Sequence, residues 1–287
     1  MALSVIGVIG VIGAGQMGSG IAQVAAMSGL EVIMQDISAD GLARGKTRIE
    51  QSLGKFSEKG RLTDAEAIAA KGRIQLTQRL EDFSNVDIVI EAVTEDPNLK
   101  FEIFRKLDKI CREHAILASN TSSISITAIG AQTKRPECIV GMHFMNPVPI
   151  MKLVELIRGL KTSAETFSLV RGFGEKMGKI CVESKDYPGF VVNRILMPMI
   201  NEACYALFEG LASVEDIDNA MKLGTNQPMG PLALADFIGL DTCLAILNVL
   251  HEGLGDPKYR PCPLLKQYVA AGQLGKKIGQ GFYKYDV

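Results

Sequence analysis

The sequence predicts an α/β fold, in which a mostly parallel sheet with flanking helices is followed by a smaller all-helical domain. From Val8 to about residue 185, short apolar segments alternate with segments of helical length, a pattern typical of βαβ units. After Pro188-Gly189 no convincing strand pattern appears until the last few residues, and apolar helix patterns take over. Because a Pro-Gly pair interrupts regular structure, we expect two domains, residues 1–187 and 188–287.

The expected elements follow from the spacing of apolar residues. Strands are predicted at Val8–Ile12, Glu31–Asp36, Ile74–Leu76, Val86–Glu91, Ala115–Ala118, Ile139–Phe144, Lys152–Ile157 and Lys179–Glu183. Helices are predicted at Met17–Ser28, Ala39–Lys59, Asn98–Arg112, Ser163–Met177, Phe190–Phe208, Val214–Leu223, Leu232–Phe237, Asp241–Glu252 and Leu264–Ala271. An Ile-Gly-Val triplet occurs at 6–8 and again at 9–11. Only one copy can end the first strand, so we expect Met1 to Gly7 to be a partly ordered extension.

The composition excludes several classes of protein. The 287 residues are 47% hydrophobic and 22% charged, with a net charge of −1, which fits a globular protein and gives no reason to expect a nucleic-acid or membrane partner. The longest apolar run, Val5 to Gly15, is shorter than the ~20 residues that span a bilayer. Six Cys without a CxxC and three His without paired spacing favour reduced thiols and no metal site. We expect a cytoplasmic protein.

A glycine-rich segment follows the first expected strand and opens the first expected helix. Gly13, Gly15 and Gly18 have the GxGxxG spacing, in the context that the dinucleotide-binding fingerprint requires. Gly13 permits a tight turn, Gly15 lets the backbone approach a pyrophosphate, and Gly18 lets the helix pack closely on the sheet. The helix N-terminus then attracts the phosphates. The expected cofactor-binding loop is Gly13, Ala14, Gly15, Gln16, Met17 and Gly18.

The end of the second strand supports the same function. Asp36 lies eighteen positions after Gly18, where an acid accepts hydrogen bonds from the adenosine ribose. Its charge would also repel a 2′-phosphate, so the sequence favours NAD over NADP and predicts a Rossmann-like first domain. The alternatives are a glycine-rich turn without a ligand, or a methyltransferase that binds a different nucleotide.

Two residues are candidates for acid–base chemistry. His143 lies near the end of an expected strand, and Glu155 shares a strand face with Leu153 and Ile157. A buried carboxylate needs a partner, and a base that works near neutral pH needs a group that orients it. A His–Glu pair would satisfy both needs. Taken alone, however, the residues favour the alternative of a core His and an unrelated strand Glu.

Longer motifs occur in order along the chain and point to one family. They are Asn120-Thr121-Ser122-Ser123, the stretch 141–155, Pro188 to Arg194, Glu215 to Asp218, Met221 to Gly224, Met229-Gly230-Pro231 and Gly279 to Tyr283. From Val8 to Tyr285 the chain resembles the NAD-dependent 3-hydroxyacyl-CoA dehydrogenase family, and within it the short, stand-alone 3-hydroxybutyryl-CoA dehydrogenases. The departures are minor: Met145 stands where many relatives carry Phe, and Thr94 where a small apolar residue is common.

The resemblance implies a role for each candidate residue. His143 would be the general base that removes the C3 hydroxyl proton, and Glu155 would orient its imidazole. Ser122 and Asn193 would contact the 3-oxygen and the thioester; an N-cap for Ser122 and a satisfied polar group for Asn193 are the alternatives. The resemblance places further residues beside the cofactor: Glu95, Lys100, Ser122, Asn146 and Lys277.

The helix at 39–59 carries a possible coenzyme A contact. Arg48, Ser52, Lys55 and Lys59 are spaced four, three and four apart, so they share one face. Such a face is usually just solvated, but the resemblance assigns Ser52 and Lys59 to the acyl-CoA substrate.

The helix at 190–208 is apolar nearly all round and must be buried, either within its own domain or against another subunit. We expect this helix and the methionine-rich segments near it to supply a subunit interface; these methionines are Met197, Met199, Met221 and Met229. The resemblance implies a homodimer built through the helical domain.

Three functions remain open at the level of sequence. The first is NAD-dependent oxidation of a short-chain (3S)-3-hydroxyacyl-CoA. The second is a non-catalytic, crystallin-like NAD-binding relative, against which the complete set of Ser122, His143, Glu155 and Asn193 argues. The third is a β-hydroxyacid dehydrogenase that acts on free acids, a class with a similar domain plan that uses a catalytic Lys.

Overall fold

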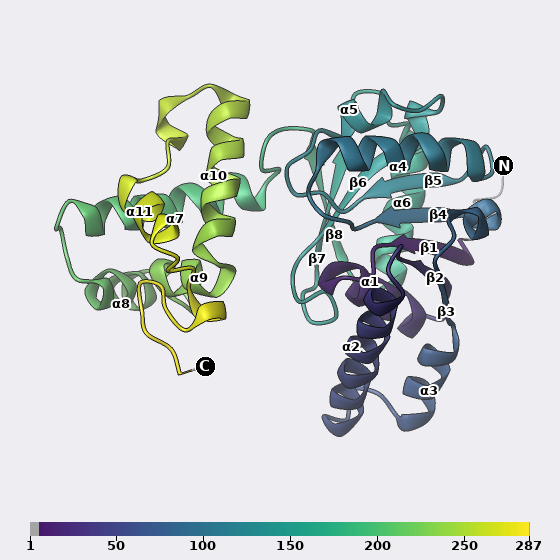
Figure 1. Ribbon diagram of the computed structural model, residues 1–287, viewed down its shortest axis with the longest axis horizontal. Helices are drawn as coiled ribbons and strands as arrows, with labels where there is room; N and C mark the ends of the chain where they lie inside the picture. Colours follow the sequence, from purple (N-terminus) through teal and green to yellow (C-terminus); the bar gives the residue numbers. More distant parts are fainter. Residues whose placement is uncertain (1–5, 287) are drawn as a thin grey trace. The chain divides into compact units, whose positions relative to one another are not determined.

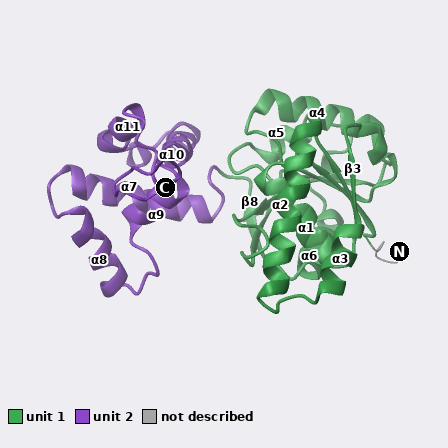
Figure 2. Ribbon diagram, turned by 60° about the horizontal axis from the view of Figure 1, so that its bottom comes forward, with its two compact units in different colours: residues 1–187 green, residues 188–287 purple. Residues whose placement is uncertain are grey.

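The computed structural model describes residues 6–286, so the expectation for the extension at Met1 to Val5 lies outside the described residues. The chain separates into two compact units, Met1–Tyr187 and Pro188–Val287 (Figure 2). Gly7, the last residue of the expected extension, is tied to unit 1: its N–H donates to Asp87 Oδ2 at 2.9 Å, and its carbonyl accepts from the Glu31 N–H at 3.1 Å.

Within the described part of unit 1, an eight-stranded sheet has the order β3-β2-β1-β4-β5-β6-β7-β8. The predicted α/β class is confirmed, since the first six strands are mutually parallel and only the β6–β7 pairing is antiparallel. The strands are β1 (Val8–Ile12), β2 (Glu31–Gln35), β3 (Ile74–Thr77), β4 (Ile88–Glu91), β5 (Ile116–Ser119), β6 (Ile139–Phe144), β7 (Leu153–Arg158) and β8 (Ile180–Lys185). The central strands are buried on both faces, which explains their continuous apolar sequence.

Helices cover both faces of this sheet (Figure 1). On one face α1, α2, α3 and α6 pack into a single apolar core, and α4 and α5 lie on the other. Their bounds are α1 (Gln16–Met27), α2 (Ala39–Glu58), α3 (Asp64–Gly72), α4 (Pro97–Ile110), α5 (Ile126–Gly130) and α6 (Ala164–Lys176). Helix α3 was not predicted from the sequence. Thr63 and Glu66 form a capping box at its start, and such a box is a recognisable signal for the beginning of a helix.

Unit 2 is helical, with α7 (Val192–Phe208), α8 (Val214–Gly224), α9 (Pro231–Ile238), α10 (Leu240–Leu254) and α11 (Pro263–Ala270). Helix α7 begins two residues later than predicted, because Phe190 has a φ of +49°, outside the helical region. One face of α7 packs in the unit's own core, where Met197 is buried. Met197 was expected at a subunit interface, but its side chain packs within its own unit, because this core encloses it.

The C-terminal segment of unit 2 is held by a buried acid. Asp236 is fully buried and accepts hydrogen bonds from the N–H groups of Phe282 and Tyr283, each at 2.9 Å, and from the Tyr285 hydroxyl at 3.0 Å. Burial raises the pKa of Asp236 and raises that of Tyr285. A carboxylate with three donors is well satisfied although it lies away from water, so it fastens the last residues to α9.

No single helix in the described range is long and apolar enough to cross a membrane. Helices α9 and α10 reach that length and composition only together, and they are bent by 98° with respect to each other. Their apolar residues Leu232, Leu240 and Leu247 lie in the core of unit 2.

Candidate active site

The candidate residues of unit 1 gather at one edge of its sheet. Gly13 follows β1, Asp36 follows β2, Glu95 lies in the loop after β4, Ser122 follows β5, and His143 is the penultimate residue of β6. Because these strands are parallel, their carboxyl ends meet at the same edge. The strand order reverses between β1 and β4, and ligands of open α/β sheets bind outside the carboxyl ends at such a switch point.

The three glycines of the fingerprint differ in how their surroundings would accommodate a side chain. Gly13 has a φ of +94°, and a Cβ there would lie 2.6 Å from the carbonyl oxygen of Ala92. A Cβ on Gly18 would lie 1.8 Å from the Gly13 carbonyl oxygen. At Gly15, in contrast, a Cβ would meet nothing within 4 Å. The protein itself therefore does not require glycine at this position, whereas a ligand that approaches the backbone would.

The start of α1 is suited to an anion. Gly15 is its N-cap residue, no side chain caps it, and no acidic residue lies in its first turn. The N–H groups of a first helical turn have no partner within the helix, and the helix dipole favours negative charge there. A diphosphate fits this position.

A cavity of 490 Å³ lies beside the glycine loop. Its wall includes Gly15, Met17 and Asp36, together with the apolar side chains of Leu99 and Ile103. Ligand cavities typically combine such apolar walls with a few polar groups. The cavity thus has the chemistry that the adenosine part of a dinucleotide needs.

Asp36 is tied to the glycine loop by its own hydrogen bonds. Its Oδ2 accepts from the Ala14 N–H at 2.8 Å, and its Oδ1 accepts from the Ser38 N–H at 3.0 Å. Each carboxylate oxygen can accept more than one hydrogen bond, so the side chain has remaining capacity for a ribose hydroxyl.

His143 and Glu155 face each other across the antiparallel β6–β7 pairing. His143 Nδ1 lies 2.8 Å from Glu155 Oε2. Glu155 is fully buried, and His143 is 8% exposed. An ionised carboxylate can only accept, so the neutral imidazole carries its proton on Nδ1, and Nε2 is the acceptor. The pair has the geometry of an oriented general base.

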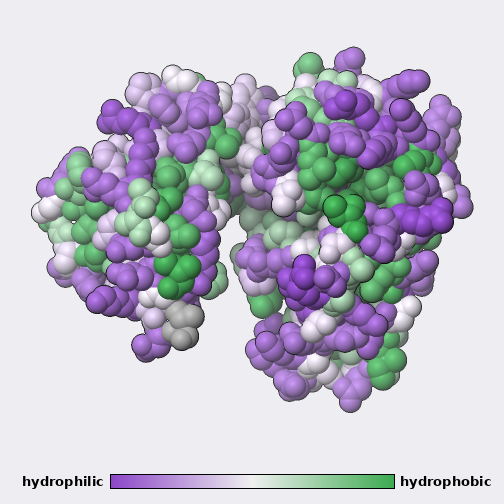
Figure 3. Space-filling model, viewed as in Figure 1, coloured by the Kyte–Doolittle hydropathy of each residue, from purple (hydrophilic) through white to green (hydrophobic). Residues whose placement is uncertain are grey.

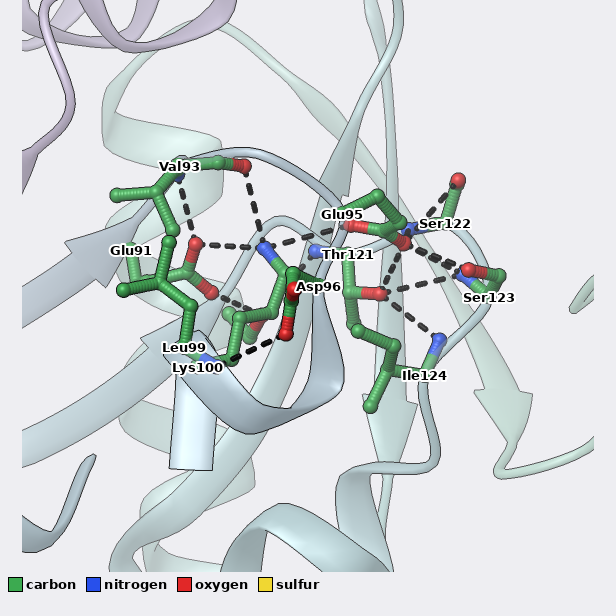
Figure 4. Close-up of polar contacts among 11 residues, drawn as sticks. Glu91, Val93, Glu95, Asp96, Leu99, Lys100, Thr121, Ser122, Ser123 and Ile124 are labelled. Carbon is green, nitrogen blue, oxygen red and sulfur yellow. Dashed lines mark hydrogen bonds and ion pairs between the residues drawn. The ribbon is translucent and has the colours of Figure 1, made fainter. Parts of the chain in front are cut away.

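Glu95 holds the loop that carries Ser122 (Figure 4). Its Oε1 accepts from the Ser122 N–H at 2.9 Å, the Ser123 N–H at 3.1 Å and the Ser123 hydroxyl at 2.7 Å. The Thr121 hydroxyl donates to the same oxygen. Burial alone would raise the pKa of Glu95, but the ammonium of Lys100 and these hydrogen bonds outweigh it and hold the pKa below its usual value.

The loop after β6 contacts the glycine loop. Asn146 Oδ1 accepts from Gln16 Nε2 at 3.0 Å, and the Asn146–Pro147 peptide bond is cis. The ammonium of Lys179 donates to the carbonyls of Val148 and Met151 at 2.6 and 2.8 Å. The structure thus brings two of the predicted cofactor residues, Gln16 and Asn146, side by side.

The proposed coenzyme A residues lie on α2. Ser52 is half-buried, and Lys59, the C-cap residue, is exposed. Arg48, on the same face, donates from Nη1 to the carbonyl of Ala14 at 3.2 Å. This residue therefore supports the glycine loop.

Asn193 and Lys277 belong to unit 2. Asn193 lies in the second position of α7 and is buried. Lys277 Nζ donates to both carboxylate oxygens of Asp241, at 2.7 and 2.6 Å. This pairing within unit 2 orients the ammonium of Lys277.

Glu91 and Thr121 contact the candidate site residues but were not predicted from the sequence. Thr121 lies in the motif Asn120-Thr121-Ser122-Ser123, but the contact of its hydroxyl with Glu95 depends on the fold. Glu91 could have been found, because it is an acid at the end of the apolar run Ile88-Val89-Ile90. A charge in a strand that is otherwise buried needs a partner, and this often marks a functional site.

The sheet order, the glycine loop at its switch point and the acid after β2 define a dinucleotide-binding α/β enzyme with a helical second domain. The domain families described as "3-hydroxyacyl-CoA dehydrogenase, NAD binding domain" and "3-hydroxyacyl-CoA dehydrogenase, C-terminal domain" match residues 8–187 and 189–285. The chain belongs to the 3-hydroxyacyl-CoA dehydrogenase family. It is therefore an oxidoreductase, and NAD is its cofactor.

Relatives that match this chain over nearly their full length are named as 3-hydroxybutyryl-CoA dehydrogenases. A probable 3-hydroxybutyryl-CoA dehydrogenase of Bacillus subtilis is 59% identical over 276 residues, which cover 96% of each chain. A 3-hydroxybutyryl-CoA dehydrogenase of Bradyrhizobium diazoefficiens is 54% identical, over 98% of this chain and 96% of its own. The crystal structure of (S)-3-hydroxybutyryl-CoA dehydrogenase from Ralstonia eutropha has a TM-score of 0.96 and 52% identity, and the match covers 99% of this chain and 100% of that one.

Proposed function

We propose that the protein interconverts short-chain (3S)-3-hydroxyacyl-CoA, above all 3-hydroxybutyryl-CoA, and the corresponding 3-oxoacyl-CoA. The observation that carries this proposal is the buried His143–Glu155 pair at the sheet edge that also bears the glycine loop. The names of the relatives support the substrate. The 3S configuration rests on the resemblance to the family.

In oxidation, His143 Nε2 accepts the proton of the C3 hydroxyl. Glu155 holds the ring with its proton on Nδ1 and stabilises the imidazolium that forms. NAD, when bound, takes up the hydride that leaves C3. In reduction, the imidazolium returns the proton to the 3-oxygen. General-base catalysis of this kind contributes ~10²–10⁴-fold to a rate.

Other residues of the chain position the two ligands. The N–H groups at the start of α1 bind the diphosphate, and Asp36 accepts from the ribose hydroxyls. Ser122 and Asn193 donate to the 3-oxygen and the thioester region, where negative charge develops. Ser52 and Lys59 bind coenzyme A. Glu95, Asn146 and Lys277 complete the cofactor site, and Lys100, which is buried, acts on this site through its ion pair with Glu95.

A direct assay separates the proposed function from the alternatives. Purified protein is expected to oxidise NADH when acetoacetyl-CoA is added, and to reduce NAD with 3-hydroxybutyryl-CoA. With free 3-hydroxybutyrate it is expected to be inactive. Turnover of the free acid with no turnover of the CoA ester would identify a β-hydroxyacid dehydrogenase. Binding of NADH without any turnover would identify a crystallin-like relative.

The same proposal includes a homodimer built through the helical unit. Helix α7 fills the core of unit 2 with one face but leaves Ile195 67% exposed on another. Phe237 and Leu223 of the same unit are also exposed. Figure 3 shows hydrophobic patches between hydrophilic ones on the face of this unit that is in view. Subunit contacts commonly use such exposed apolar side chains.

A further inference from the structure

A buried acid at the end of β4 fixes a buried lysine. Glu91 is fully buried, and its Oε1 accepts from Lys100 Nζ at 2.6 Å and from the Val93 N–H at 2.7 Å. Its Oε2 accepts from the Ser119 hydroxyl at 2.6 Å. Lys100 is only 1% exposed, so its ammonium has little access to water and depends on these partners.

The ammonium of Lys100 lies between two carboxylates but not midway. It is 2.6 Å from Glu91 Oε1 and 3.3 Å from Glu95 Oε2. The other oxygen of Glu95, Oε1, receives the donors from the loop after β5, including the N–H groups of Ser122 and Ser123. The two oxygens of Glu95 thus have separate partners, one the cation and the other the loop (Figure 4).

We propose that Glu91 is a positioning residue for the dehydrogenase reaction. By holding Lys100 on the side of β4, it limits the cation to one oxygen of Glu95 and leaves the other for the loop that carries Ser122. Without the charge of Glu91, the ammonium moves toward both oxygens of Glu95 and competes with the N–H groups of Ser122 and Ser123. The inference rests on the proposed function, in which Ser122 contacts the 3-oxygen.

The test uses Glu91→Gln, which keeps the shape of the side chain and removes its charge. Hydrogen exchange followed by mass spectrometry is expected to show faster exchange at the amides of Ser122 and Ser123. In the reduction of acetoacetyl-CoA, kcat is expected to fall about 10- to 100-fold, the range that a displacement of about 1 Å can cause. KM is expected to stay near its original value, because Ser52 and Lys59 are untouched.

Asp108→Asn is the matched control, because it breaks a partly buried ion pair near the other end of the same helix. Asp108 Oδ1 lies 2.9 Å from Arg135 Nε, and it stands eight residues after Lys100 in α4. This variant is expected to lower the Tm while exchange at Ser122 and kcat stay unchanged. If Glu91→Gln behaves in the same way, Glu91 is only structural and the inference is wrong.

A double variant separates stability from positioning. Glu91→Gln/Lys100→Met removes both charges of the ion pair between β4 and α4. Since no buried ammonium is then left without its carboxylate, the Tm is expected to recover. Exchange at the amides of Ser122 and Ser123 is expected to return toward its original rate, because no ammonium is left to compete for Glu95 Oε1. Exchange that stays as fast as in Glu91→Gln would overturn the inference.

If Glu91→Gln does not fold, Glu91→Asp is a milder perturbation, since it keeps the charge but shortens the side chain that places Oε1 2.6 Å from Lys100 Nζ. It is expected to change exchange at Ser122 and kcat in the same direction, by a smaller factor, and no change in either would also overturn the inference. The exchange measurement needs no substrate. If the unmodified protein does not reduce acetoacetyl-CoA, the proposed function fails, and exchange alone decides the role of Glu91.

Discussion

Replacement of Glu155 by Gln is expected to slow catalysis without loss of ligand binding. The Gln side chain has nearly the same shape, and its amide oxygen can still accept from His143 Nδ1. The ring therefore stays close to its position opposite Glu155 in the β6–β7 pairing. What the variant loses is the negative charge beside the imidazolium.

The size of this loss follows from the geometry. The two side chains are hydrogen-bonded at 2.8 Å and are buried. For charge centres ~4 Å apart and an effective dielectric constant of ~20, the attraction is about 4 kcal/mol. With about half of the proton transferred in the transition state, ~2 kcal/mol is lost, which corresponds to ~30-fold in kcat.

The assay is the steady-state oxidation of 3-hydroxybutyryl-CoA, together with NADH binding measured by fluorescence. Glu155→Gln is expected to lower kcat ~30-fold, and His143→Ala by ~10²–10⁴-fold. The binding of NADH is expected to survive both changes. The double variant is expected to lose less than the product of the single losses, because the two residues act as one unit.

Glu183→Gln is the control for this experiment. Glu183 lies on the neighbouring strand β8, and it pairs with Arg158 near the surface, so its replacement is expected to leave kcat unchanged. An unchanged kcat in Glu155→Gln would remove Glu155 from the mechanism. Losses that multiply in the double variant would show that the two residues act independently.

Three further predictions concern the cofactor, the subunit contact and the stability of unit 2. Asp36→Asn is expected to narrow the preference for NADH over NADPH about tenfold or more, because it removes the charge that repels a 2′-phosphate; faster turnover of NADPH than NADH by the unmodified protein would contradict this. Sedimentation is expected to show a dimer of the 31.0 kDa chain. Ile195→Glu is expected to weaken the dimer, whereas Leu160→Glu in unit 1, where Leu160 is 84% exposed, is expected to leave it intact. Asp236→Ala is expected to lower the free energy of unfolding by about 3–5 kcal/mol, since it leaves three donors without their acceptor; thermal unfolding at the original Tm would refute this.

The sequence predicted the α/β class, most element bounds to within two residues, and the glycine loop with Asp36. These features are local, or they are spaced along the chain in a way that the dinucleotide fingerprint makes recognisable. The long helix pattern at 190–208 was also predicted, although its first turn is interrupted by the left-handed backbone of Phe190. Helix α3 was missed, although its capping box is written in the sequence.

The contacts of the candidate site depend on strand order and register, which periodicity does not contain. His143 and Glu155 are twelve residues apart, and only the antiparallel pairing of β6 with β7 places them opposite each other. Glu91, Lys100, Glu95 and Ser119 come from β4, α4, the loop between them and β5. Only Glu91, an acid at the end of an apolar strand, is conspicuous in its own segment, and the other three side chains are not. Their charges become a network only because the fold buries them together, where each must find a partner among residues that are distant in the sequence.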